Sequence, residues 1–307
     1  MPLTLTALLL LAGPMPAQEP EPSRPSTSFR TGVELVSLNV TVTDPAGRYV
    51  TDLTQEDFAV YEDGVKQDLT FFSRTNFPVT LTFLIDTSSS MEEKMATAQE
   101  AAVGYARRLR PQDLAAVVDF DSRVEVLQSF TNSVPSLERA IRKTSAGGST
   151  SLYNAIYVSL KESRKAVAGP AGEVRRRALI LLSDGEDTSS LVSFDEVLEL
   201  ARRSDTAIYA IGLMSSEPNP TRAFREANYA LRQFASETGG RAFFPSEVGD
   251  LATTYGQIFE ELSSQYTLGY TPKNTRQDGA WRRMVVRVGR PNVTARTKEG
   301  YYAPGAR

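Results

Sequence analysis

Apolar and polar positions divide the chain into three zones with different periodicities. In the first zone, from about residue 33 to 76, the residues over 36–42 alternate between apolar and polar, which is the period of a half-buried strand. Shorter alternating runs follow over 58–60 and 69–71, with the turn sequence Glu62-Asp63-Gly64 between them. Short strands at hairpin spacing predict an antiparallel β unit that is too small to bury much core alone.

The second zone, from about residue 78 to 264, alternates apolar strands with helical stripes. Strands are expected over 79–85, 115–120, 124–127, 178–182, 207–213 and 241–244. Helical spacing of apolar residues is found over 91–109, 152–160, 194–201, 224–234 and 251–262. Repeated β-α units predict a doubly wound, mostly parallel sheet with helices on both faces, which is an α/β fold.

The third zone, from residue 265 to the end, returns to strands, with alternation at 266–270 and 283–288. Zones one and three together predict one small antiparallel β-sandwich of about seven strands, with the α/β domain inserted into it or flanked by it. The expected boundaries are 31–77 for the first part of the sandwich, 78–264 for the α/β domain and 265–307 for the second part.

The first residues contain a short apolar run, Leu3 to Gly13, which is too short to span a bilayer as a helix. A Pro-rich stretch follows over 18–30. This arrangement predicts a signal peptide over 1–17, cleaved near Ala17, and therefore a periplasmic or extracellular protein without a transmembrane helix in the mature chain. No Lys or Arg precedes the apolar run, so a disordered N-terminal tail is the alternative.

Composition narrows the possible chemistry. The chain has neither cysteine nor histidine, which excludes disulfides, thiolate and histidine metal sites, and the Ser-His-Asp and Cys-His forms of catalysis. The net charge of −3 lacks the basic footprint of a nucleic-acid binder. The one dense basic run, Arg175-Arg176-Arg177, is interpreted as a solvated loop before a buried strand.

Oxygen-bearing side chains gather after two predicted strands and before one predicted helix. Asp86, Ser88 and Ser90 follow the first strand, and Asp184 follows the strand over 178–182. The loop over 147–150, Gly-Gly-Ser-Thr, precedes a helix. Carboxyl ends of parallel strands lie at one edge of a sheet, and hard oxygen donors suit a hard divalent cation.

Two simpler interpretations compete with a metal site. Asp86 and Ser88 alone could cap the helix that follows them, since Asp and Ser are good N-caps. The Gly-Gly-Ser-Thr loop could suggest a phosphate loop, but it lacks the lysine and the spacing of that motif, and no Gly-x-Gly-x-x-Gly follows a strand. We therefore expect no nucleotide and no nucleic acid among the ligands.

The three segments together resemble the von Willebrand factor type A (VWA) domain in order and approximate spacing: Asp-x-Ser-x-Ser, Gly-Gly-x-Thr and Ser-Asp-Gly. The resemblance implies a metal-ion-dependent adhesion site (MIDAS). Ser88 and Ser90 would ligate the cation through their hydroxyls, and Thr150 would bind it directly when a partner is present. Asp86 and Asp184 would act directly or through water. The implied cofactor is Mg²⁺, with Mn²⁺ or Ca²⁺ as alternatives.

The flanking zones resemble a bacterial family of exported, VWA-related proteins, on the residues Leu53-Thr54-Gln55-Glu56-Asp57-Phe58 and Val60-Tyr61-Glu62-Asp63-Gly64. The leading hypothesis is a non-enzymatic interaction or adhesion protein. Its protein partner would supply an Asp or Glu carboxylate to the metal.

Two other functions stay open. In the first, the sandwich binds an envelope partner through an aromatic face made by Trp281, Tyr301 and Tyr302, and the metal is purely structural. In the second, the chain is a metal-dependent hydrolase, although the sequence near Asp86 and Asp184 offers no evident His, Lys or Tyr as a base.

Overall fold

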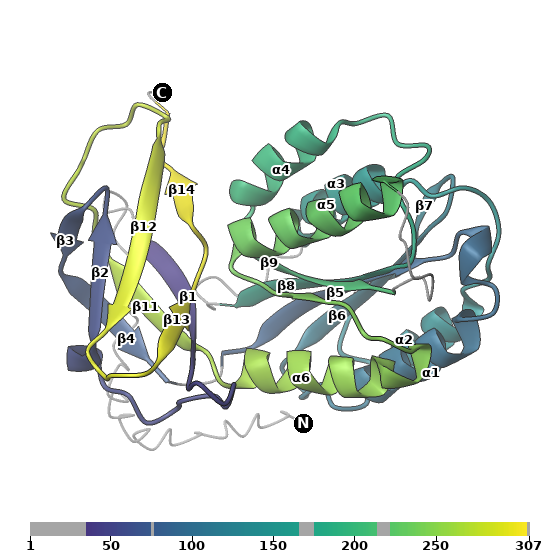
Figure 1. The fold of residues 1–307 in the computed structure, drawn as a ribbon, viewed down its shortest axis with the longest axis horizontal. Coiled ribbons are helices and arrows are strands. Elements are labelled where there is room, and N and C mark those ends of the chain that lie inside the picture. Colours follow the sequence, from purple (N-terminus) through teal and green to yellow (C-terminus); the bar gives the residue numbers. More distant parts are fainter. Residues whose placement is uncertain (1–34, 75–76, 166–174, 214–221, 306–307) are drawn as a thin grey trace, which may run out of the picture. The chain divides into compact units, whose positions relative to one another are not determined.

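A computed structural model describes residues 35–74, 77–165, 175–213 and 222–305. A six-stranded sheet of order β10-β9-β8-β5-β6-β7 forms the centre of the α/β part (Figure 1). Its strands are β5 (Val79–Asp86), β6 (Leu114–Phe120), β7 (Val124–Thr131), β8 (Arg176–Ser183), β9 (Thr206–Gly212) and β10 (Ala242–Phe243). Neighbours are parallel except β6 and β7, which form an antiparallel hairpin. The predicted α/β fold is confirmed.

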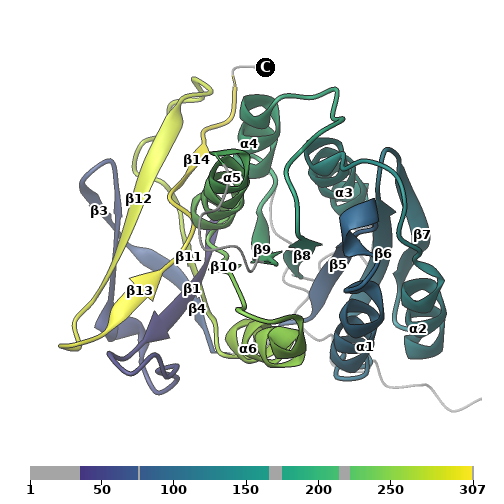
Figure 2. The ribbon, with the colours of Figure 1, turned by 45° about the vertical axis from the view of Figure 1, so that its right-hand side comes forward.

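Helices cover both faces of this sheet, as the views in Figures 1 and 2 agree. One face carries α1 (Met95–Ala106), α2 (Val134–Lys143) and α6 (Leu251–Ser263). The other carries α3 (Leu152–Lys165), α4 (Phe194–Arg202) and α5 (Arg222–Thr238). Because β5 lies between these two layers, every one of its residues is buried, including Thr80, Thr82 and Asp86.

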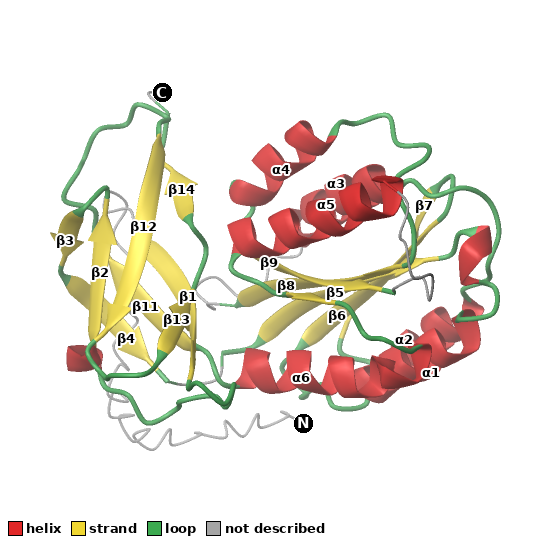
Figure 3. Cartoon of the chain, in the orientation of Figure 1, coloured by secondary structure: helices red, strands yellow, loops and turns green. Residues whose placement is uncertain are grey.

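Strands from both ends of the chain form two further sheets, of order β13-β1-β11-β4 and β14-β12-β2-β3 (Figure 3). The strands are β1 (Val36–Thr43), β2 (Phe58–Glu62), β3 (Val65–Gln67), β4 (Leu69–Ser73), β11 (Tyr266–Tyr270), β12 (Trp281–Val288), β13 (Thr294–Arg296) and β14 (Gly300–Tyr302). One apolar cluster, which includes Leu38, Val60 and Leu268, fills the space between them.

The pairing of β1 with β11 and of β2 with β12 brings the first and third zones together. Both pairs are antiparallel, with Val36 opposite Tyr270 and Val60 opposite Val286. An antiparallel sandwich therefore flanks the α/β part, as the sequence predicts. Val33–Arg307 form one compact unit, so the domain boundaries at 77 and 264 stay predictions.

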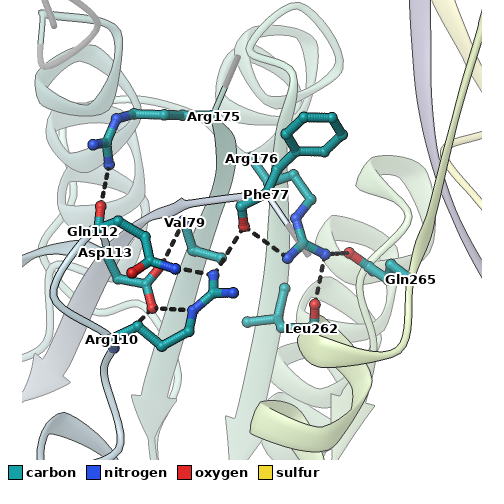
Figure 4. Close-up of polar contacts among 9 residues, drawn as sticks. All are labelled: Phe77, Val79, Arg110, Gln112, Asp113, Arg175, Arg176, Leu262 and Gln265. Atoms are coloured by element: carbon teal, nitrogen blue, oxygen red, sulfur yellow. Dashed lines mark hydrogen bonds and ion pairs between the residues drawn. The ribbon is translucent and has the colours of Figure 1, made fainter. Parts of the chain in front are cut away.

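The run Arg175-Arg176-Arg177 differs from its sequence interpretation. Arg176 begins β8 and is buried, with 4% of its surface exposed, so the run is not simply a solvated loop. Its guanidinium donates to the carbonyl oxygens of Phe77 at 3.0 Å and Leu262 at 2.5 Å (Figure 4). The Phe77 carbonyl also accepts from Arg110 at 3.0 Å, so two arginines hold the chain at the entrance to β5.

Helix α2 is the one α-helix of the described residues that the sequence analysis omits. It begins after Ser133, with a proline in its first turn, and buries Leu137, Ala140 and Ile141 against the sheet. Short 3₁₀ helices lie at Gln55–Asp57, Ser89–Met91 and Val248–Asp250.

The predicted signal peptide (1–17) and linker (18–30) lie outside the described residues. No helix in the described part of the chain is both long and apolar enough to cross a membrane.

Candidate metal centre

The candidate ligands lie at the carboxyl ends of β5 and β8, two parallel neighbours in the middle of the sheet. β5 ends at Asp86 and β8 ends at Ser183. The chain leaves β5 toward β6 on one side and later returns to β8 on the other, so these two ends flank the topological switch point. Open α/β sheets bind ligands at this position.

Asp86 is fully buried beneath the site. Its Oδ1 accepts from the backbone N–H of Ser88 at 2.8 Å, and its Oδ2 accepts from the Ser183 hydroxyl at 2.6 Å. Burial raises the pKa of Asp86 above its ordinary value, the hydrogen bonds from Ser183 and Ser88 oppose this shift, and the neighbouring Asp184 carboxylate adds to it. The Asp86 carboxylate therefore orients the turn that carries both serines.

The hydroxyls of Ser88 and Ser90 and the carboxylate of Asp184 form a continuous chain of oxygen atoms. The two Oγ atoms are 3.1 Å apart, and Ser90 Oγ donates to Asp184 Oδ1 at 2.7 Å. Adjacent ligands of an octahedral ion with metal–oxygen distances of 2.0–2.1 Å are about 3.0 Å apart. Ser90 is exposed, whereas Ser88 and the Asp184 side chain are buried, so solvent reaches this chain of oxygens at Ser90. Their spacing and chemistry fit a small divalent cation.

Lys94 also contacts this chain of oxygens. Its Nζ donates to Asp184 Oδ2, as an ion pair, and to the carbonyl oxygen of Ser90 at 3.2 Å. The sequence analysis finds no evident lysine near the acids to serve as a base, and the structure places Lys94 at the site as an ion-pair donor to Asp184. The spacing of four residues between Ser90 and Lys94 could have revealed it, since such residues lie on one side of a helical turn.

The loop over 147–150 is tied to the loop after β5 by backbone hydrogen bonds. Gly147 N–H donates to the Thr87 carbonyl at 2.7 Å, and Ser89 N–H donates to the Gly148 carbonyl at 3.1 Å. Gly148 has a φ of +76°, and a Cβ there would lie 2.9 Å from Asp121 Oδ2. This tight approach explains why a glycine stands at position 148 and fixes the path of the chain toward residue 150.

Thr150 is buried, with 5% of its surface exposed, and its carbonyl accepts from the N–H groups of Thr188 and Ser189 at 2.8 and 3.1 Å. Its Oγ1 lies 3.7 Å from the position that a Cβ on Gly185 would take. The Thr150 hydroxyl therefore lies beside the residue that follows Asp184. Among the described residues, no hydrogen bond joins this hydroxyl to the other four candidate ligands.

The arrangement thus connects four of the five candidate residues, Asp86, Ser88, Ser90 and Asp184, and places Thr150 next to them. Within the described ranges, no group of three or more acidic side chains is arranged to hold a metal. The available donors are therefore hydroxyls and two carboxylates, which are hard ligands of the kind that Mg²⁺ prefers.

The comparisons with known proteins agree with this fold. The family model of the von Willebrand factor type A domain matches residues 80–257. A Synechocystis sp. protein named uncharacterized protein sll0103 is 29% identical over 114 residues, which cover 36% of this chain and 26% of the relative. The match therefore spans about a quarter of the length of that relative.

Solved structures resemble the chain at lower identity. The von Willebrand factor type A structure from Catenulispora acidiphila is 12% identical, covers 91% of this chain and 76% of its own, and has a TM-score of 0.52. The vWF domain of the type V pili tip protein Mfa5 from Porphyromonas gingivalis is 14% identical, covers 61% and 95%, and has a TM-score of 0.47. Because the family model matches more than half of the chain, this protein belongs to the von Willebrand factor type A domain family.

Proposed function

We propose that this protein is an exported, non-enzymatic interaction module that binds a protein partner through a divalent cation. The cation, Mg²⁺ in preference to Mn²⁺ or Ca²⁺, would be held by Asp86, Ser88, Ser90, Thr150 and Asp184. The observation that carries this proposal is the chain of oxygens from Ser88 through Ser90 to Asp184 at the switch point of the sheet.

The donor set favours a partner with a carboxylate. Three neutral hydroxyls and two carboxylates, one of which also accepts hydrogen bonds from Ser88 and Ser183, supply at most five ligands and leave a bound ion with an incomplete shell. Mg²⁺ commonly keeps several waters in its coordination shell. An Asp or Glu side chain of a partner protein would replace one of these waters and complete the coordination shell.

Lys94 gives the site a cation of its own. In the absence of a metal its ammonium neutralises Asp184. A metal bound at Asp184 would have to displace this ammonium, because two cations so close together repel each other. The affinity for metal alone would then be lowered, and a partner carboxylate would raise it.

A hydrolase is the weaker alternative. A metal-dependent hydrolase needs a group that accepts a proton from the attacking water. Lys94 is the amine at the site, and it is held as the donor in an ion pair with Asp184. VWA domains are generally interaction modules, and this chain belongs to that family.

An interaction surface on the sandwich is also less well supported. The three aromatic residues that could form it are each partly buried and engaged within the chain. Trp281 packs edge-on against Tyr302 at a centroid distance of 4.9 Å, and the Tyr302 hydroxyl donates to Glu199. Tyr301 donates to Glu62 at 2.9 Å. These contacts are those of packed side chains and not of an open aromatic face.

A fluorescence anisotropy assay with a labelled glutamate-containing peptide tests the proposal. We expect saturable binding in excess Mg²⁺ that is abolished by EDTA and by Asp86→Ala, with an unchanged circular dichroism spectrum. Glu186→Gln is the matched control, since Glu186 is an exposed carboxylate in the same loop as Asp184. Equal binding by the wild type and Asp86→Ala in Mg²⁺ would contradict the proposal.

A further inference from the structure

A second concave site lies at the amino-terminal end of β8, whereas the candidate metal centre lies at the carboxyl end of the same strand. The cavity has a volume of about 550 Å³ and is lined from both the α/β part and the sandwich, for example by Arg177 of β8 and Tyr302 of β14. β8 begins in this cavity at Arg176 and ends at Ser183, so about 23 Å of strand separates the two sites. Small-molecule sites commonly have volumes of 300–1,000 Å³.

The lining of the cavity is strongly basic. Six arginines and Lys298 line it, together with one carboxylate, Asp205; the arginines are Arg164, Arg175, Arg176, Arg177, Arg202 and Arg203. This concentration is local, because the whole chain has a net charge of −3. A cavity with walls of one sign of charge attracts ligands of the opposite sign.

Part of this charge is neutralised within the protein. Arg202 forms a two-pronged pair with Glu237 at 2.7 and 3.1 Å, and Arg203 pairs with Glu199 at 2.7 Å. Lys298 pairs with Asp205 at 2.5 Å. These pairs engage the lining carboxylate, Asp205, and two acids that do not line the cavity, Glu237 and Glu199.

Arg164 and Arg177 keep their charge available. The described hydrogen bond of Arg177 goes to a neutral acceptor, the Ser204 carbonyl, at 3.3 Å. Arg164 is exposed at the end of α3 and has no hydrogen bond or ion pair with any described residue. Burial lowers the pKa of Arg177, Asp205 opposes the shift, and Arg164 adds to it. The two guanidinium groups are therefore close enough to repel each other.

A simpler account explains part of the cluster. Basic residues in the last turn of a helix stabilise its C-terminus, and this accounts for Arg164 and Arg202 at the ends of α3 and α4. It does not account for Arg175, Arg176 and Arg177, which belong to the entrance of a parallel strand. Nor does it account for Lys298, which comes from the sandwich.

We propose that this cavity binds a small molecule that carries phosphate or sulfate groups, with Arg164 and Arg177 as its principal ligands. Guanidinium groups match the planar, two-point geometry of such oxyanions. A bound oxyanion would relieve the repulsion between the two arginines. The ligand would also contact both the α/β part and the sandwich, because both contribute lining residues.

Isothermal titration of the full-length, EDTA-treated chain with inorganic pyrophosphate, at constant ionic strength, tests the proposal. We expect one site, at least about tenfold tighter for pyrophosphate than for acetate, and a loss of about fivefold or more in each of Arg164→Gln and Arg177→Gln. Arg177→Lys should lose less affinity than Arg177→Gln but bind more weakly than the wild type, because it keeps the charge without the two-point geometry. Arg139→Gln, an exposed arginine on α2, and Asp86→Ala should bind like the wild type.

Three results would overturn the proposal. The first is the absence of saturable pyrophosphate binding by the folded wild-type chain. The second is an equal loss of affinity in Arg139→Gln and Arg164→Gln, which would indicate a diffuse charge effect. The third is loss in Asp86→Ala alone, which would place the anion at the other site. A loss of Mg²⁺ binding leaves this test unaffected, because the titration is carried out without metal.

Discussion

The ion pair between Arg296 and Glu261 allows a quantitative test of how the sandwich is fastened to the α/β part. Arg296 lies on β13 of the sandwich, and Glu261 lies on α6. Arg296 Nη2 is 2.5 Å from Glu261 Oε1, and the Glu261 side chain is completely buried. The Tyr209 hydroxyl also donates to Oε1 at 2.9 Å, whereas Oε2 has no hydrogen-bond partner among the described residues.

Arg296→Met would leave this carboxylate buried beside a single hydroxyl donor. Removing one partner of a buried ion pair typically costs about 3–5 kcal/mol. The Arg296 side chain is 31% exposed, so water can partly replace it, which favours the lower end of that range. We therefore expect the free energy of unfolding to fall by about 3 kcal/mol, measured by urea denaturation at neutral pH.

Two further variants separate the buried charge from other effects. Arg290→Met removes an arginine of the same sandwich whose partner, Asp52, is 71% exposed, and it should cost no more than about 1 kcal/mol. Adding Glu261→Gln to Arg296→Met removes the unpaired charge and should recover part of the loss. A cost below about 1 kcal/mol for Arg296→Met, or no recovery in the double variant, would refute this reasoning.

Three smaller predictions concern the α/β part. Lys94→Met should raise the affinity for Mg²⁺ about tenfold in calorimetry, since a unit and a double charge about 5 Å apart in water repel by roughly 1.7 kcal/mol; unchanged affinity would contradict the competing-cation role. Burial, aided by neighbouring carboxylates, raises the pKa of Asp119 from 3.8 to about 6, so its ionisation costs stability as the pH rises through this window. Asp119→Asn should therefore stabilise the protein by about 1 kcal/mol in urea denaturation at pH 7, and less at pH 4. Gly148→Ala should destabilise the fold more than Gly47→Ala, because both glycines have positive φ but only position 148 would bring a Cβ against Asp121; thermal denaturation that shows equal costs would disprove the clash.

The strands and most helices could be predicted from the sequence because burial imposes a periodicity. β5 is buried at every position because helices cover both faces of its sheet, whereas β1 alternates because it forms one side of a sandwich. Helix α2 had the same kind of signal in Val134, Leu137 and Ile141, spaced by three and four residues. Its ten residues make fewer than three helical turns, so this signal is short.

The sequence could predict which residues form the candidate site and where they lie on the sheet, but not the contacts between their side chains. Motif spacing places Asp86, Ser88, Ser90, Thr150 and Asp184 at one sheet edge, which is where the structure has them. Their individual contacts depend on side-chain directions that arise from tertiary packing. For this reason the role of Ser183, which donates a hydrogen bond to Asp86, was not predictable from composition or periodicity.

The basic run at residues 175–177 shows a different limit. Charge suggests exposure, but a guanidinium can be buried where backbone carbonyls have no partner in a sheet or helix. Arg176 meets this condition at the carbonyls of Phe77 and Leu262. These two carbonyls come together only in the folded structure, where the start of β5 lies near the end of α6.

Calorimetric titration of the full-length chain with MgCl₂, in the presence of acetate as a carboxylate that can complete the coordination shell, tests the central claim most directly. We predict one saturable site in the wild type and in Glu186→Gln, and at least a tenfold loss of affinity in Asp86→Ala and in Ser90→Ala. Circular dichroism should show that all four proteins are folded. No Mg²⁺ or Mn²⁺ binding by the folded wild type, with or without acetate, would contradict a metal-dependent interaction module.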